Sequence, residues 1–223
     1  MAKKKVYTSK SPTRRAKAAV FGLWFHLIGA AAFGAASAWH LALLLKLDQN
    51  LEVRPDFIAS ESTGFILAFG LSSLIYLASV VVSLVPFLMW IHRTNRNAHV
   101  LAPSFEMSPA WGVGWFFVPF AGLVKPFEGV EKTWCISTDP TRWRSQDTPA
   151  LLRWWWGLFL ASNIAGSFSN LVSRENTIAG QSSAAGLTIA TMAVIVASCV
   201  ASIILVRRLT SRQVVALNTL AFD

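Results

Sequence analysis

The sequence predicts an all-α integral membrane protein with four transmembrane helices and one short Trp/Pro-rich segment that is re-entrant or interfacial. Hydrophobic residues make up 54% of the chain and charged residues only 14%, whereas soluble domains carry about 25% charged residues. The apolar residues form four blocks without Asp, Glu, Lys or Arg, at 18–45, 64–91, 154–172 and 182–206. Each block is near or above the roughly 20 residues of a spanning helix, whereas a β-barrel would show short alternating strands.

The charge pattern gives the predicted topology. Residues 1–17 form a basic tail, and further Lys and Arg lie within 92–153 and after 206. The positive-inside rule then places both termini and residues 92–153 in the cytoplasm, and the loops 46–63 and 173–181 outside. Because the net charge of +9 follows this pattern, we interpret it as a topology signal and expect no nucleic-acid partner.

The first predicted helix, 18–45, resembles a signal peptide in part. Ala36-Ser37-Ala38 has the form of a cleavage site, so removal of the helix after Ala38 stays an alternative. We favour an uncleaved anchor because the apolar run continues to residue 45. Small residues recur every four positions here and in the last helix, which predicts close helix packing within the chain or in a homo-oligomer. They are Ala30, Gly34 and Ala38, then Ala193, Ala197 and Ala201.

The segment 110–124 follows the second helix and has the sequence AWGVGWFFVPFAGLV. At about 1.5 Å per residue it is too short to cross a core of about 30 Å as a helix. Pro119 also removes a backbone donor in its middle. A crossing would move the basic residues that follow it outside, so we predict re-entry or an interfacial position. Five transmembrane helices are the alternative.

The remaining elements complete a single membrane domain over 18–223. Residues 126–137 are predicted as an amphipathic surface helix, because Phe127, Val130 and Trp134 share one face. Residues 138–150 form a polar linker. The helix 154–172 then opens on three consecutive Trp residues, a type that favours the membrane interface, and 182–206 is the last crossing.

Several motifs between His92 and Trp156 carry a resemblance. They are Arg93 and Asn97, Ser108-Pro109-Ala110-Trp111, Trp115 to Phe120 with Pro119, Lys125-Pro126-Phe127-Glu128 with Glu131, and Trp154-Trp155-Trp156. This stretch resembles an uncharacterised bacterial membrane family, domain of unknown function 4328. The resemblance implies a protein of the bacterial inner membrane and implies no activity.

Candidate chemistry is sparse in this sequence. The four apolar blocks contain no carboxylate, which argues against ion-coupled transporters and pumps. We find no phosphate-binding loop, no metal-ligand spacing and no catalytic triad pattern, so we expect neither enzyme activity nor a cofactor. His26 and His40 share a helix face, and we interpret them as structural rather than as haem ligands.

We therefore predict a structural or accessory inner-membrane protein that acts with a lipid or protein partner, or as a homo-oligomer. The alternative is a channel or facilitator whose pore the re-entrant segment lines. The candidate functional residues lie in and around that segment, and the charged ones among them form either ion pairs that seat it or a substrate mouth. They are Arg93, Asn97, Ser108, Pro109, Trp111, Trp115, Pro119, Pro126, Glu128 and Glu131.

Overall fold

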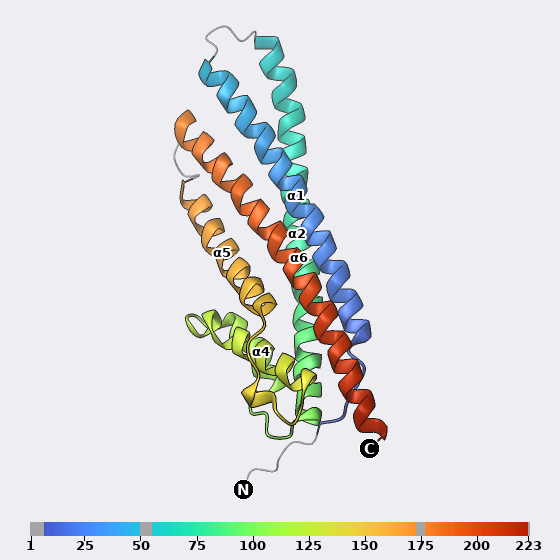
Figure 1. Cartoon of the computed structure of the whole chain (residues 1–223). Helices are drawn as coiled ribbons and strands as arrows, with labels where there is room; N and C mark the ends of the chain where they lie inside the picture. Colours follow the sequence, from blue (N-terminus) through green and yellow to red (C-terminus); the bar gives the residue numbers. More distant parts are fainter. Residues whose placement is uncertain (1–6, 50–54, 173–176, 223) are drawn as a thin grey trace. The chain divides into compact units, whose positions relative to one another are not determined.

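The computed structural model describes residues 7–49, 55–172 and 177–222, and every regular element within those ranges is helical (Figure 1). The long helices are α1 (Thr13–Gln49), α2 (Pro55–Leu101), α5 (Ala150–Val172) and α6 (Ile178–Phe222). The shorter elements are α3 (Pro109–Gly114), η1 (Trp115–Phe117), η2 (Ala121–Leu123), α4 (Lys125–Thr138) and η3 (Trp143–Ser145). Residues 1–6 of the predicted basic tail and parts of both predicted outer loops lie outside the described residues.

Among the described residues, three helices are long and apolar enough to cross a membrane. They are Thr13–Lys46 in α1, Thr63–Leu101 in α2 and Ile178–Leu220 in α6. The predicted third crossing is present as the helix α5, but α5 is not one of these three. Large apolar side chains are exposed along α2. They include Ile66, Leu67, Leu74 and Val81. An apolar surface of this extent indicates a membrane protein.

The long helices extend beyond the apolar blocks that predicted them. α2 continues from the block end at 91 to Leu101, and α6 continues from 206 to Phe222. Charged residues ended both blocks, but they do not end the helices, because apolar packing continues past them. Ala98 and Leu101 of α2 belong to a core cluster that Ala216 and Leu217 of α6 pack against.

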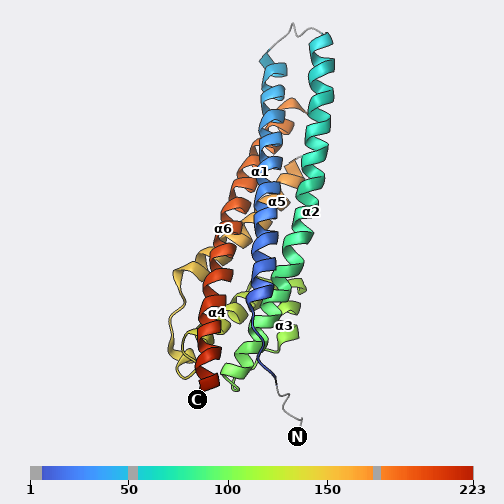
Figure 2. The same ribbon diagram turned by 90° about the vertical axis from the view of Figure 1, so that its right-hand side faces the viewer.

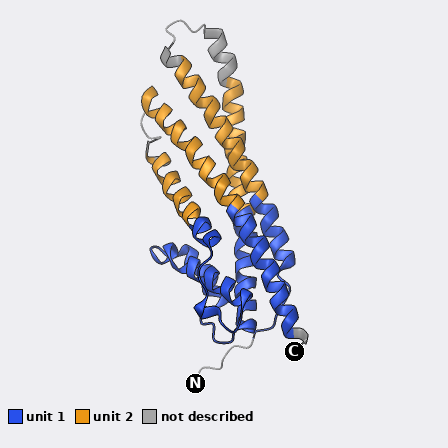
Figure 3. Cartoon of the chain, viewed as in Figure 1, with its two compact units in different colours: residues 1–23, 83–156, 201–223 blue, residues 24–82, 157–200 orange. Residues whose placement is uncertain are grey.

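The chain divides into two compact units (Figure 3). Unit 1 comprises Met1–Leu23, Ser83–Trp156 and Ala201–Asp223, and unit 2 comprises Trp24–Val82 and Gly157–Val200. Parts of α1, α2 and α6 occur in each unit. The candidate functional residues all belong to unit 1.

Unit 2 is built from close helix contacts. The Nδ1 atom of His26 and the hydroxyl of Ser79 lie 2.9 Å apart in a hydrogen bond. A Cβ on Gly29 would lie 2.7 Å from the Ser79 hydroxyl oxygen, so α1 approaches α2 at a distance that only glycine permits there. Ala30 packs in a buried cluster with Met192.

The predicted small-residue rows have different surroundings in the two helices. In α1, Ala30 is buried, and a Cβ on Gly34 would lie 3.2 Å from Met192. In α6, Ala193 and Ala197 are exposed, and only Ala201 of that row is buried. Ala38, the third member of the row in α1, is exposed. The first two residues of the row in α1 therefore pack within the chain, and most of the row in α6 does not.

Candidate functional site

Two buried amide side chains connect α2 to α6 within unit 1. Asn97 and Gln213 are both fully buried. The Nδ2 atom of Asn97 donates to Oε1 of Gln213 at 2.9 Å and to the backbone carbonyl of Lys10 at 2.9 Å. Its Oδ1 atom accepts from the Lys10 backbone N–H at 3.2 Å. Asn97 therefore fixes the segment before α1 as well as the last helix.

The network extends from Gln213 to α4. The Nε2 atom of Gln213 donates to the Thr94 carbonyl at 2.9 Å and to the Ser137 hydroxyl at 3.3 Å. One turn earlier on α6, Thr210 accepts from Nε1 of Trp90 at 2.9 Å. Buried polar groups that are satisfied in this way specify one packing arrangement, because any other arrangement leaves them without partners.

In the structure, the predicted segment 110–124 begins one residue earlier, at Pro109, as a short capped helix. Residues 109–124 are called the segment from here on. Ser108 is the N-cap of α3 and accepts from the Trp111 N–H at 3.3 Å, and Pro109 occupies the first turn, where no donor is needed. A Cβ on Gly112 would lie 3.0 Å from Nδ2 of Asn95 on α2. Glycine thus lets α3 lie against α2 (Figure 2).

The middle of this segment reverses direction at a strained turn. Phe120 has φ 60° and ψ −51°, and the Ala121 N–H donates to the Pro119 carbonyl at 2.6 Å. These values describe a γ-turn of the rare form with positive φ, which a bulky residue adopts at a cost. After the turn, a Cβ on Gly122 would lie 3.0 Å from the Trp115 carbonyl oxygen. The chain therefore doubles back closely on itself.

The same segment exposes large apolar side chains. Phe120 at the turn is 87% exposed. Trp111, Phe117, Leu123 and Val124 are also exposed. Trp156 anchors the base of the segment, because its Nε1 donates to the Leu123 carbonyl at 2.9 Å. The turn is therefore fixed at its base by Trp156, and its aromatic and aliphatic side chains are exposed.

α4 packs on protein along the face that the sequence assigned to the membrane surface. Val130 and Trp134 are buried, and the guanidinium of Arg212 lies 4.5 Å from the Trp134 ring centroid. Pro126 is also buried, near the first residue of the helix. The hydrophobic pattern identifies the apolar face of a helix, but it does not distinguish protein from lipid as its neighbour.

The acidic residues of α4 pair locally. Glu128 forms ion pairs with Lys125 at 3.0 Å and with Lys132 at 3.8 Å. All three side chains are partly exposed, so each pair contributes little stability. Glu128 thus orders the first turns of α4 and does not pair with Arg93.

Glu131 lies at a cavity of about 460 Å³, which α4 lines together with residues 105–107 between α2 and α3 and residues 143–146 after α4. It accepts a hydrogen bond from the Thr148 hydroxyl. Burial raises the pKa of Glu131, the nearby charge of Lys132 lowers it, and that of Glu128 raises it again. Cys135 also lines the cavity, and burial followed by the Glu131 charge raises the pKa of its thiol. A thiol with a raised pKa is a poor nucleophile.

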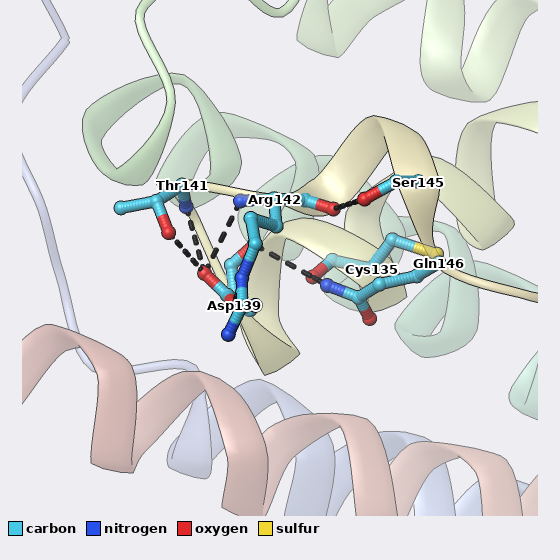
Figure 4. Close-up of polar contacts among 6 residues, drawn as sticks. All are labelled: Cys135, Asp139, Thr141, Arg142, Ser145 and Gln146. Atoms are coloured by element: carbon cyan, nitrogen blue, oxygen red, sulfur yellow. Dashed lines mark hydrogen bonds and ion pairs between the residues drawn. The ribbon is translucent and has the colours of Figure 1, made fainter.

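A tight turn after α4 is held by polar contacts (Figure 4). The Asp139 carboxylate accepts from the Thr141 hydroxyl at 2.6 Å and N–H at 2.9 Å, and from Arg142. These hydrogen bonds, the Thr141 hydroxyl first, lower the pKa of Asp139 to about 2. Gln146 then donates to the Cys135 carbonyl at 3.0 Å and holds the linker against α4.

The structure separates the candidate residues into distinct groups. Asn97 belongs to the buried network, whereas Arg93 lies near Arg15 of α1. Ser108, Pro109, Trp111, Trp115 and Pro119 build the exposed segment. Pro126, Glu128 and Glu131 belong to α4.

Sequence reasoning missed Gln213, the central residue of the network. The sequence predicts a cytoplasmic C-terminus after 206, because Arg207 and Arg208 end the apolar block. The signal that was available is the helical spacing of Leu209, Gln213, Ala216 and Leu217, which continues the buried face of α6.

Within the described ranges, no group of three or more His, Cys, Asp and Glu side chains is arranged to hold a metal ion. A family model described as domain of unknown function (DUF4328) matches residues 53–211. Neither the comparison with curated proteins nor that with solved structures gave a match.

Proposed function

We propose that this chain, which belongs to the DUF4328 family, is an accessory protein of the bacterial inner membrane that binds a protein or lipid partner through the segment 109–124. The observation that carries this proposal is the turn at Phe120. It holds a bulky, exposed aromatic side chain at positive φ, where a glycine would remove the strain. Backbone strain of this kind concentrates at functional sites.

The proposal includes a topology. α5 would be the fourth crossing beside α1, α2 and α6, and both termini would lie in the cytoplasm. The segment would then enter and leave on the cytoplasmic side, with its exposed apolar side chains in the membrane interface or against a partner. The basic residues between 125 and 153 support this arrangement, because a crossing by the segment would place them outside.

The direct test is native mass spectrometry of complexes extracted gently from the native membrane. We expect the wild-type chain to retain a defined polypeptide or lipid. The variant Phe117→Ala/Phe120→Gly should lose it, because both exposed rings are removed. The matched control is Phe21→Ala/Leu67→Ala, which removes two similarly exposed apolar side chains outside the segment and should retain the partner.

Two outcomes would contradict the proposal. Equal retention by the variant and the control would show that the segment does not bind the partner. A homo-oligomer without other components, combined with ion or solute flux in liposomes that Phe117→Ala/Phe120→Gly abolishes, would favour a channel lined by the segment.

A further inference from the structure

Four basic side chains gather in unit 1 where the apolar block of α2 ends. His92, Arg93 and Arg96 are on α2, and Arg15 is on α1. Nη1 of Arg15 donates to the Met89 carbonyl at 2.9 Å, which places its guanidinium beside the end of the block. The charges of Arg15, Arg93 and Arg96 all act on the His92 ring. We call these four residues the basic cluster.

The basic cluster has no anionic counterpart in the part of the chain that the structure describes. The ion pairs found there join other residues. Nη1 of Arg93 and Nε of Arg96 are buried donors without a hydrogen-bond partner. Like charges repel, and buried donors that lack acceptors are unfavourable. An anion with several oxygens would remove both costs.

Neighbouring residues hold Arg96 in place but do not provide a hydrogen-bond acceptor for its Nε atom. Its Nη2 donates to the Thr8 hydroxyl at 3.4 Å, and its guanidinium carbon lies 5.9 Å from the Tyr7 ring centroid. The segment containing Tyr7 and Thr8 is itself fixed through Lys10 and the buried Asn97. The basic cluster is therefore bordered by ordered structure.

The position along α2 identifies the class of anion. The uncharged block 64–91 ends directly before His92, and at about 1.5 Å per residue it is long enough to cross a core of about 30 Å. Residues 92–96 thus follow at the depth of lipid headgroups. Guanidinium groups bind phosphate through paired hydrogen bonds. We propose that the basic cluster binds the phosphate of an anionic phospholipid headgroup.

This site goes beyond the proposed function, since it shares no residue with the segment 109–124. The two proposals also fail separately. Loss of partner retention in Phe117→Ala/Phe120→Gly leaves the basic cluster intact, and neutralising the basic cluster leaves the exposed aromatic residues intact.

The test is a lipid titration of the purified full chain in detergent, followed by native mass spectrometry. The probes are phosphatidylglycerol, diacylglycerol with the same acyl chains, and inorganic phosphate as competitor. Arg93→Gln/Arg96→Gln should weaken phosphatidylglycerol binding about tenfold or more, because both guanidinium groups lose their charge-assisted hydrogen bonds to the phosphate. The matched control Arg207→Gln/Arg208→Gln removes the same charge from exposed positions of α6 outside the basic cluster and should change binding less than about twofold.

Further measurements distinguish a lipid phosphate from free phosphate. A Lys variant also shows whether weaker binding by the Gln variant is due only to misfolding. Diacylglycerol should bind weakly to every variant, and competition by millimolar inorganic phosphate would assign the basic cluster to free phosphate. Arg93→Lys/Arg96→Lys keeps the charge but loses the paired geometry, and it should bind with intermediate affinity. Equal weakening in both Gln pairs, or unchanged binding in Arg93→Gln/Arg96→Gln, would overturn the proposal.

Discussion

Unit 1 and unit 2 use different means to hold helices together. In unit 1, long polar side chains reach between α2, α4 and α6 and satisfy one another in a buried network centred on Gln213. In unit 2, the helices approach through small residues, stacked rings and short polar contacts. Examples are Gly29 against Ser79, Phe33 stacked on Tyr76, and Ser169 hydrogen-bonded to Thr188 at 2.7 Å.

The difference shows where each unit tolerates change. A polar network fails when one member is removed, because its partners remain buried without hydrogen bonds. A close-packed contact fails when volume is added, because the neighbouring helix must move. Deletions should therefore damage unit 1 most, and small enlargements should damage unit 2 most.

The largest effect should come from Gln213→Leu in unit 1. The change removes the hydrogen bonds from Gln213 to Asn97, Thr94 and Ser137 and leaves one buried amide hydrogen of Asn97 unpaired, so we expect a loss of about 3 kcal/mol in the free energy of unfolding. Thermal unfolding in detergent, followed by circular dichroism, measures it. The control is Asn218→Leu on the exposed face of α6, for which we expect a change within about 0.5 kcal/mol. Similar unfolding temperatures for the two variants would mean that the network is dispensable.

The corresponding change in unit 2 is Gly29→Ala. Its new methyl group would meet the Ser79 hydroxyl at 2.7 Å and disturb the hydrogen bond to His26, so we expect a loss of about 1–3 kcal/mol. Gly70→Ala is the matched control, because a Cβ there meets nothing within 4 Å. The control should be neutral or stabilising, since Ala favours helix over Gly by about 1 kcal/mol. If both variants unfold alike, close approach does not stabilise unit 2.

A smaller effect of opposite sign is expected at the turn of unit 1. Phe120→Gly relieves positive φ at an exposed side chain, and we expect a gain of about 0.5–1 kcal/mol in stability. The same substitution at Phe117, within η1, should be destabilising because its backbone needs no such relief. Unfolding temperatures of the two variants provide the measurement. A loss at Phe120 comparable to that at Phe117 would show that the turn carries no strain.

The smallest effects concern two carboxylates of unit 1, Asp139 in the turn after α4 and Glu131 at the cavity. Asp139 has a pKa lowered from 3.8 to about 2, so its stabilising contribution is present above pH 3.8 and is lost as the pH falls through about 2. The pKa of Glu131 is raised, so its contribution is present below its ordinary value of 4.5 and is lost as the pH rises through the folded value.

Carbon-13 NMR of the labelled carboxyl groups tests this order. As the pH falls, Glu131 should become protonated first, and Asp139 should stay ionised to about pH 2. Thr141→Val removes the hydroxyl donor and should move the Asp139 titration toward 3.8. Simultaneous titration of the two groups would contradict the different environments that the structure gives them.

The sequence predicted the helical elements better than their contacts. Long uncharged blocks identify long helices because the bilayer imposes a length, and Pro119 indicated the break that occurs in the segment. The partners of Asn97 were not predictable, because they lie 87 and 116 residues away along the chain. The turn at Phe120 was not predictable from the sequence either, because residues at positive φ are usually glycine or asparagine and not phenylalanine. The basic residues of the tail and of α2 were recognised as a topology signal, but their grouping into one cluster depends on the packing of α1 against α2.

The pairing of Asn97 with Gln213 also sets an order of events during biosynthesis. The ribosome adds Asn97 to the chain 116 residues before it adds Gln213. Until α6 arrives, the Asn97 side chain has the Lys10 backbone as a partner but lacks the amide that completes its burial. During that interval one amide hydrogen of Asn97 has no partner within the chain. A chain that ended before Gln213 would keep that hydrogen unpaired at a position buried in the folded protein, at a cost in stability.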